Sequence, residues 1–231
     1  LIHSMGISVK SVSFHFCLLP PETLAMRNAF HLLILASSLH CIAAAGNVLF
    51  VYHSETNHTA QLADALAAGC ATVPSATCKV QTIEATDVQR DVVEWADALV
   101  IGSPVHYGNP ASAMIQWFET EWEALWAAKE PPVKFGAVFA TGGGLAQGVE
   151  HVLAGLQRLL WSYRARVLTP NPTRSGYSSY GAVAITGTPP YNGSSTIAQP
   201  FVDAAKRFGV IIANEVVADV ARTYSRTGIS Y

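Results

Sequence analysis

Charged residues are scarce in this 231-residue chain, because Asp, Glu, Lys and Arg make up only 13% of it against 50% hydrophobic residues. A composition this apolar excludes an intrinsically disordered chain, which buries too little apolar surface to fold. The 14 basic and 16 acidic residues leave a net charge of −2. No basic stripe is therefore present to neutralise a phosphate backbone, and we expect no binding to nucleic acid.

Cysteine is also rare, and the four cysteines of the chain exclude a small disulfide-stapled scaffold. No cluster of Cys and His has the spacing of a zinc site, so we expect no metal. Cys70 and Cys78 lie near the predicted end of a helix and the start of the next strand. They indicate either a disulfide, which would fit an oxidising compartment, or two apolar thiols, and the sequence leaves both open.

The first 45 residues have the features of a leader. After Met26 come one Arg, an apolar run at 30–36 and three alanines at 43–45, which is the pattern of a secretory signal peptide. A signal anchor and mistranslated upstream sequence are the alternatives. We therefore expect residues 46–231 to form a single domain with no stable membrane anchor, secreted if the signal is used and cytoplasmic otherwise.

From Gly46 onward, apolar runs of strand length alternate with amphipathic segments. The pattern predicts strands at 48–52, 79–83, 98–102, 135–140 and 182–185, and helices at 59–68, 87–95, 110–125, 148–163 and 200–220. Strands that are continuously apolar are buried on both faces, as in a parallel sheet that helices cover. The alternation predicts a doubly wound α/β domain with one five-stranded parallel sheet.

Three unusual loops leave the carboxyl ends of predicted strands, where open parallel sheets bind ligands. The first, 53–59, offers hydroxyls, backbone N–H groups and a helix start to an anion, although His53 itself is expected to be solvated. It lacks the glycine patterns of triphosphate and dinucleotide loops. The second, 102–110, brackets a His–Tyr pair with small residues and prolines, which suits a planar ring. The third, 141–148, is rich in glycine, which lets a backbone approach a ligand closely.

Together the three loops resemble the flavodoxin-like family, and within it the tryptophan repressor-binding-protein type of NAD(P)H:quinone oxidoreductase. The resemblance covers about 47–217 and implies the strand order 2-1-3-4-5. It is carried by Tyr52-x-Ser54 with His58-Thr59, by Gly102-Ser103-Pro104 with Tyr107-Gly108-Asn109 and Met114, by Lys134 to Thr141 with the glycine run, and by Tyr180-Gly181-Ala182. Ser54-x-Thr56-x-x-Thr59 looks like the family's FMN phosphate loop, and we call 53–59 the phosphate loop.

The resemblance implies non-covalent FMN, NADH or NADPH as donor and a quinone as acceptor, in a ping-pong hydride transfer. It also implies a homo-oligomer, a dimer or a tetramer. The cofactor's phosphate would be held by Ser54, Glu55, Thr56, Asn57, His58 and Thr59. Its ring system would lie against Ser103, Pro104, Val105, His106, Tyr107, Gly108, Thr141, Gly142, Gly143 and Gly144. The residues nearest the substrate, with catalytic roles, would be His106, Tyr107 and Trp126.

The chain departs from the family pattern in the phosphate loop. The family often has Gly where Asn57 stands, and we expect the turn to survive because Asn tolerates a left-handed backbone. Residues 57–59 also form an N-glycosylation sequon, as do 192–194. A glycan on Asn57 would block FMN, so we expect this sequon to be unused.

A second departure lies near 161–163, where a family His on the helix after the glycine loop is replaced. Two alternatives to a quinone reductase therefore stay open. One is a flavodoxin-type electron carrier, which the weak negative charge disfavours, and the other is a degenerate secreted protein without FMN.

Overall fold

The computed structural model describes residues 45–85, 90–126, 133–144, 146–170, 180–187 and 196–227, with only the backbone at 90–91 and 122–126. The predicted leader, the predicted helix start at Asp87 and the second sequon lie outside the described residues. The elements follow in the order β1 (Gly46–Tyr52), α2 (His58–Cys70), β2 (Ala76–Thr82), α3 (Arg90–Trp95), β3 (Ala98–His106), β4 (Asn109–Pro110), α4 (Ser112–Trp126), β5 (Phe135–Gly142), α5 (Val149–Ser162), β6 (Arg166–Val167), β7 (Ala182–Ile185) and α7 (Gln199–Thr227). This alternation confirms the predicted α/β class.

One parallel sheet runs through the domain, with β1 between β2 and β3, and β5 on the far side of β3. Both β6 and β7 then pair with β5, β6 beside its first residues and β7 beside its last ones. The five predicted strands therefore follow the order 2-1-3-4-5. The difference is that the outer position is divided between β7 and the short β6, which the sequence did not predict.

The helix after β3 begins later than predicted. Pro110 does not open it, because this residue lies in β4, which pairs antiparallel with the end of β3. The chain first doubles back as a hairpin, and the Ser103 hydroxyl oxygen accepts the Ala111 N–H at 2.8 Å across it. The helix α4 then starts at Ser112.

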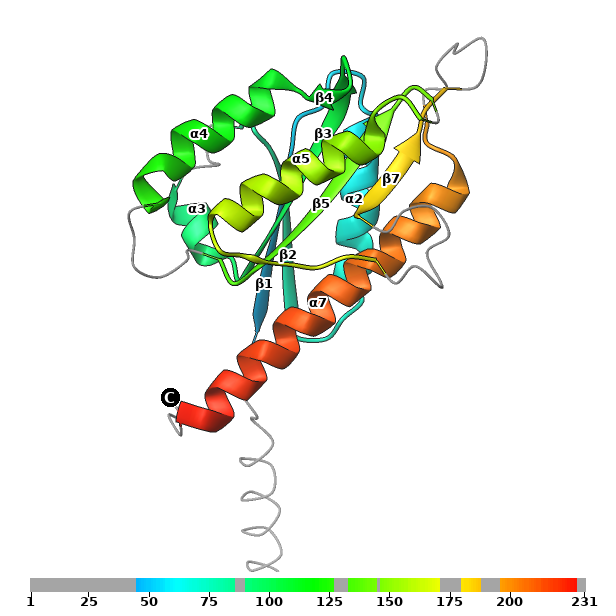
Figure 1. Ribbon diagram of the computed structural model, residues 1–231. Helices are drawn as coiled ribbons and strands as arrows, with labels where there is room; N and C mark the ends of the chain where they lie inside the picture. Colours follow the sequence, from blue (N-terminus) through cyan, green and yellow to red (C-terminus); the bar gives the residue numbers. More distant parts are fainter. Residues whose placement is uncertain are drawn as a thin grey trace, which may run out of the picture. The chain divides into compact units, whose positions relative to one another are not determined.

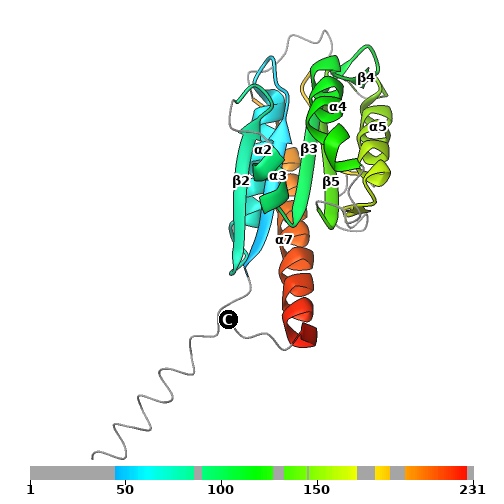
Figure 2. The same cartoon turned by 90° about the vertical axis from the view of Figure 1, so that its left-hand side faces the viewer.

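Helices cover both faces of the sheet (Figure 1; Figure 2). The helices α3, α4 and α5 pack on one face, and α2 and α7 pack on the other, so the strands contribute to two apolar cores. Strand β5 belongs to both cores, and each of its residues is buried. Within the described ranges, no helix combines the length and the apolarity needed to cross a membrane.

The helices α2 and α7 cross at two glycines. A Cβ atom on Gly69 would lie 1.9 Å from the carbonyl oxygen of Lys206, and one on Gly209 would lie 1.9 Å from that of Leu66. Rigid backbone leaves no room for a side chain at such a distance, so the two helix backbones touch directly. This crossing fixes the position of α2, whose start forms part of the candidate site.

A disulfide joins Cys70, the last residue of α2, to Cys78 in β2, with the Cα atoms 6.3 Å apart. Of the two possibilities that the sequence left open, the structure contains the disulfide. Because β2 is at the edge of the sheet, the bond ties the end of α2 to the edge strand.

Candidate functional site

The three predicted loops follow β1, β3 and β5, which are neighbours in the sheet, so the loops meet at one edge. Two contacts join them. The buried hydroxyls of Thr59 and Thr141 hydrogen-bond at 2.8 Å, between the first loop and the third. Gly148 packs on Gly108, where an added Cβ atom would lie only 2.7 Å from the Gly108 Cα atom. Each of these contacts requires a particular small or hydroxyl-bearing residue.

The phosphate loop ends in a left-handed turn at the start of α2. Asn57 is the N-cap residue with a φ of 67°, and its side chain makes no capping hydrogen bond. The predicted survival of this turn with Asn is therefore confirmed. Among the described residues, no hydrogen bond uses the backbone N–H of Glu55, Thr56 or Asn57. A helix start whose N-cap side chain makes no capping bond, beside unpaired loop N–H groups, is a geometry that binds a phosphate, so the loop fits this part of FMN.

The hydroxyls of the phosphate loop have two kinds of position. Ser54 Oγ accepts the Ala60 N–H at 3.4 Å, and Thr56 Oγ1 lies 2.9 Å from His58 Nδ1, both outside the core. Thr59, by contrast, uses its hydroxyl inside the domain. Ser54 and Thr56 are therefore the hydroxyls that an anion at the loop surface could reach, while Thr59 fixes the loop from beneath.

The second loop presents Tyr107 at the tip of the hairpin, with a fully exposed side chain and a left-handed φ of 50°. An exposed tyrosine ring is free to stack on a planar ligand ring. Ser103 lies at the opposite extreme and is fully buried. Its hydroxyl donates to the Pro104 carbonyl at 2.8 Å while it accepts the Ala111 N–H. Ser103 therefore shapes the loop from within.

The third loop begins in the buried end of β5. A Cβ atom on Gly142 would lie 2.5 Å from Val149 Cγ2, so close packing against α5 requires glycine there. A Cβ atom on Gly143 would meet only Gln147 Oε1, at 3.7 Å, so the backbone at Gly143 borders open space. This opening beside the hairpin leaves room for the edge of a planar group.

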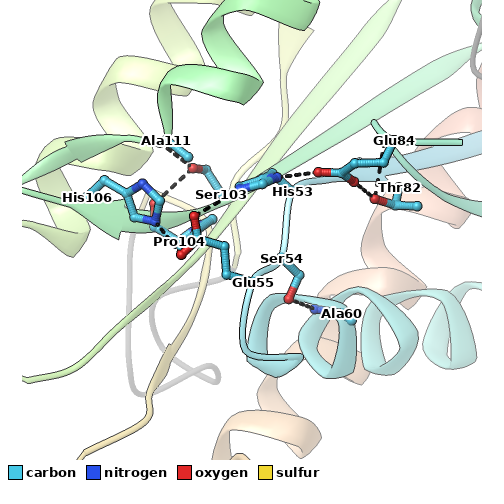
Figure 3. Close-up of polar contacts among 10 residues, drawn as sticks. All are labelled: His53, Ser54, Glu55, Ala60, Thr82, Glu84, Ser103, Pro104, His106 and Ala111. Carbon is cyan, nitrogen blue, oxygen red and sulfur yellow. Dashed lines mark hydrogen bonds and ion pairs between the residues drawn. The ribbon is translucent and has the colours of Figure 1, made fainter.

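A cluster of two histidines and two glutamates lies at the ends of β1, β2 and β3 (Figure 3). His53 Nδ1 is 2.5 Å from Glu84 Oε1, and His53 Nε2 is 3.6 Å from Glu55 Oε1. The other Glu55 oxygen lies 3.6 Å from His106 Nε2. The two imidazole rings meet edge to face, with their centroids 6.2 Å apart.

The cluster corrects one prediction and adds one residue, Glu84, that sequence reasoning missed. His53 is not a solvated loop residue, because its ring lies between Glu84 and His106 and only 12% of its side chain is exposed. Glu84 follows β2, whose end was not among the three loops singled out. The available signal was that β2 also ends at the same edge of a parallel sheet.

Tyr52, the last residue of β1, directly precedes His53 of this cluster. Burial raises the pKa of its phenol above the usual value of 10.0, and the nearby carboxylates of Asp64 and Glu84 raise it further. The hydroxyl therefore stays protonated at neutral pH. Tyr52 brings no charge to the site.

Trp126 is not brought to these loops. Helix α4 begins beside the hairpin at Ser112 and ends at Trp126, and a helix of this length rises by about 21 Å. Trp126 and the loops of the same chain are therefore at opposite ends of α4. The Trp126 side chain lies outside the described residues, and its catalytic role stays a prediction.

Comparisons with known proteins agree with this architecture. A family model described as a flavodoxin domain matches residues 49–155. The chain is 28% identical over 201 residues to an NAD(P)H dehydrogenase (quinone) of Solidesulfovibrio magneticus, which covers 73% of this chain and 96% of that protein. It is 26% identical over 146 residues to a flavodoxin of Aquifex aeolicus, which covers 62% of this chain and 76% of that protein.

Solved structures show the same fold. A flavodoxin, WrbA-like protein from Agrobacterium tumefaciens superposes with a TM-score of 0.58 at 21% identity, covering 74% of this chain and 98% of that one. A flavodoxin from the domain Archaea gives a TM-score of 0.54 at 19% identity, covering 74% and 98%. With the parallel sheet, its two helical layers and the matched sequence, these likenesses establish that the domain has a flavodoxin-like fold.

Proposed function

We propose that this flavodoxin-like domain binds FMN at the three loops and acts as an NAD(P)H:quinone oxidoreductase. The observation that carries the proposal is the left-handed turn at Asn57 with the unpaired N–H groups of the phosphate loop, at the same ends of the strands as the exposed Tyr107 and the open backbone at Gly143. Curated relatives named NAD(P)H dehydrogenase (quinone), each 28% identical, support the same activity. The proposal includes a homo-oligomer, which light scattering of the purified chain tests.

Bound FMN would supply the hydride transfer between the nicotinamide and the quinone. The chain's own residues would bind the cofactor and orient it. The N–H groups of Glu55 and Thr56, with the Ser54 hydroxyl, would hold the phosphate at the positive end of α2. Tyr107 would cover the ring system and exclude water, and the half-buried His106 would face the substrate with one ring nitrogen beside Glu55.

An electron carrier is the second candidate, because a curated flavodoxin is also among the relatives. A carrier needs a separate reductase, whereas an oxidoreductase consumes NAD(P)H by itself. The net charge of −2 favours the oxidoreductase, because strong acidity suits a carrier that docks to basic partners.

The test has two stages. The purified full chain is incubated with FMN and desalted, and retained absorbance at about 375 and 450 nm, a property of the flavin itself, shows binding. NADH and NADPH oxidation is then followed with benzoquinone as acceptor. Retained flavin with quinone-dependent oxidation of either nucleotide supports the proposal. Retained flavin without oxidation supports the carrier, and a folded colourless protein overturns both.

A further inference from the structure

The phosphate loop contains a charge that opposes its proposed ligand. Glu55 lies between Ser54 and Thr56, and the loop has no Lys or Arg. A carboxylate repels a phosphate dianion, and the repulsion grows where water is displaced. A loop that accepts phosphate must therefore keep this carboxylate turned away or offset its charge.

The histidine–glutamate cluster keeps the carboxylate turned away. One Glu55 oxygen lies 3.6 Å from His53 Nε2 and the other lies 3.6 Å from His106 Nε2, so an imidazole faces each oxygen. Figure 3 shows Glu55 directed toward the ends of β1 and β3, whereas the Ser54 side chain points toward the start of α2. The carboxylate and the nearest loop hydroxyl thus lie on different sides of the loop.

Glu84 fixes the ring that meets Glu55. Its Oε1 lies 2.5 Å from His53 Nδ1, and its Oε2 accepts a hydrogen bond from the Thr82 hydroxyl. Both nitrogens of His53 therefore face carboxylate oxygens. The short contact with Glu84 fixes the orientation of the His53 ring, so that its other nitrogen, Nε2, faces Glu55.

We propose that His53, anchored by Glu84, is a positioning residue that holds the Glu55 carboxylate out of the phosphate loop. The inference rests on the proposed FMN site and deepens it. Without His53, only His106 still faces the Glu55 carboxylate, so the side chain turns more readily toward the ligand phosphate. At contact distances in partly water-excluded surroundings, one unit charge against another weakens binding by about tenfold or more.

The experiment compares FMN with riboflavin, which lacks only the phosphate. Fluorescence titrations with the full chain give both dissociation constants for the wild type, His53→Gln, Glu84→Gln and His53→Gln/Glu55→Gln. Glu119→Gln, an exposed site on α4, is the matched control. We expect His53→Gln to raise the FMN constant about tenfold and to leave the riboflavin constant unchanged. We expect Glu84→Gln to have a smaller effect in the same direction, and the double variant to return to the wild-type value.

Each outcome decides the inference. Equal weakening of FMN and riboflavin by His53→Gln, without rescue by Glu55→Gln, would show a structural role and overturn it. Unchanged FMN binding in both single variants, with a wild type that binds FMN, would overturn this inference alone. A wild type that binds neither flavin would overturn the proposed function and this inference with it. Thermal melts of every variant identify any that fails to fold, and Glu84→Gln then supplies the single-variant comparison.

Discussion

Substitutions of Asn57 test the role of the backbone in the phosphate loop separately from the role of its side chains. Asn57 is exposed, makes no capping hydrogen bond and has a φ of 67°. A left-handed backbone costs a residue with a Cβ atom about 1–2 kcal/mol, and glycine pays none of it. Asn tolerates the conformation better than Ala, so we expect Asn57→Ala to lower the free energy of unfolding by about 1 kcal/mol. Asn57→Gly should leave it within about 0.5 kcal/mol of the wild type.

The affinity for FMN should follow the same order as stability, with the wild type and Asn57→Gly above Asn57→Ala. A shifted turn no longer directs the N–H groups of the loop at one point, so Asn57→Ala should bind FMN about fivefold more weakly, which corresponds to about 1 kcal/mol. Urea denaturation and fluorescence titration measure the two quantities. Ser75, with a φ of 68°, is the matched control. It lies just before β2, at the opposite ends of the strands from the candidate site. Ser75→Ala should lose similar stability without any change in FMN affinity.

Two results would refute this reasoning. Equal stability of the Ala and Gly variants would show that the turn imposes no requirement at Asn57. Equal FMN affinity in wild type and both variants would show that the loop backbone does not bind the phosphate.

The remaining predictions concern stability. Replacing both Cys70 and Cys78 by Ser should lower the free energy of unfolding by about 2.5 kcal/mol, from the loop of eight residues that the bond closes, and urea denaturation measures it. Gly209→Ala should cost about 3 kcal/mol, because its Cβ atom would overlap the Leu66 carbonyl, and an unchanged melting temperature would contradict the packing. The pKa of Tyr52 is raised in the folded state, so the unfolded chain loses its phenolic proton first and stability should fall as the pH rises above about 10. Tyr52→Phe should reduce this fall in denaturation curves recorded from pH 8 to 11.

The long elements could be predicted from the sequence because their patterns extend over many residues. The apolar run at 98–102 lies inside β3, and the apolar face at 148–163 corresponds to α5. The two-residue strands β4 and β6 could not be predicted, since two residues show no periodicity. Pro110 was placed in a helix because a proline before an apolar segment is typical of a helix start. The competing hairpin depends on a hydrogen bond from Ala111 to the distant Ser103.

The candidate site also has features that could be predicted from the sequence and features that could not. The loops at the strand ends could be predicted because hydroxyls, small residues and glycines are visible in the sequence and parallel strands end at one edge. The hydrogen-bond and ion-pair partners of the loop residues could not be predicted from the sequence. The Thr59–Thr141 bond joins residues 82 positions apart, and His53 meets Glu84 across 31 positions. Such contacts depend on the register of β1, β2 and β5.

The burial of β5 has a consequence for mutational tolerance. Its residues from Phe135 to Gly142 are all buried between two cores, so a change in size there disturbs packing on both faces of the sheet at once. The rim of the site is different, because Glu55, Thr56, Asn57 and Tyr107 are exposed and outside both cores. Libraries that randomise these exposed residues should therefore yield folded proteins with altered ligand preference. Libraries that randomise the buried residues of β5 should yield mostly unfolded chains.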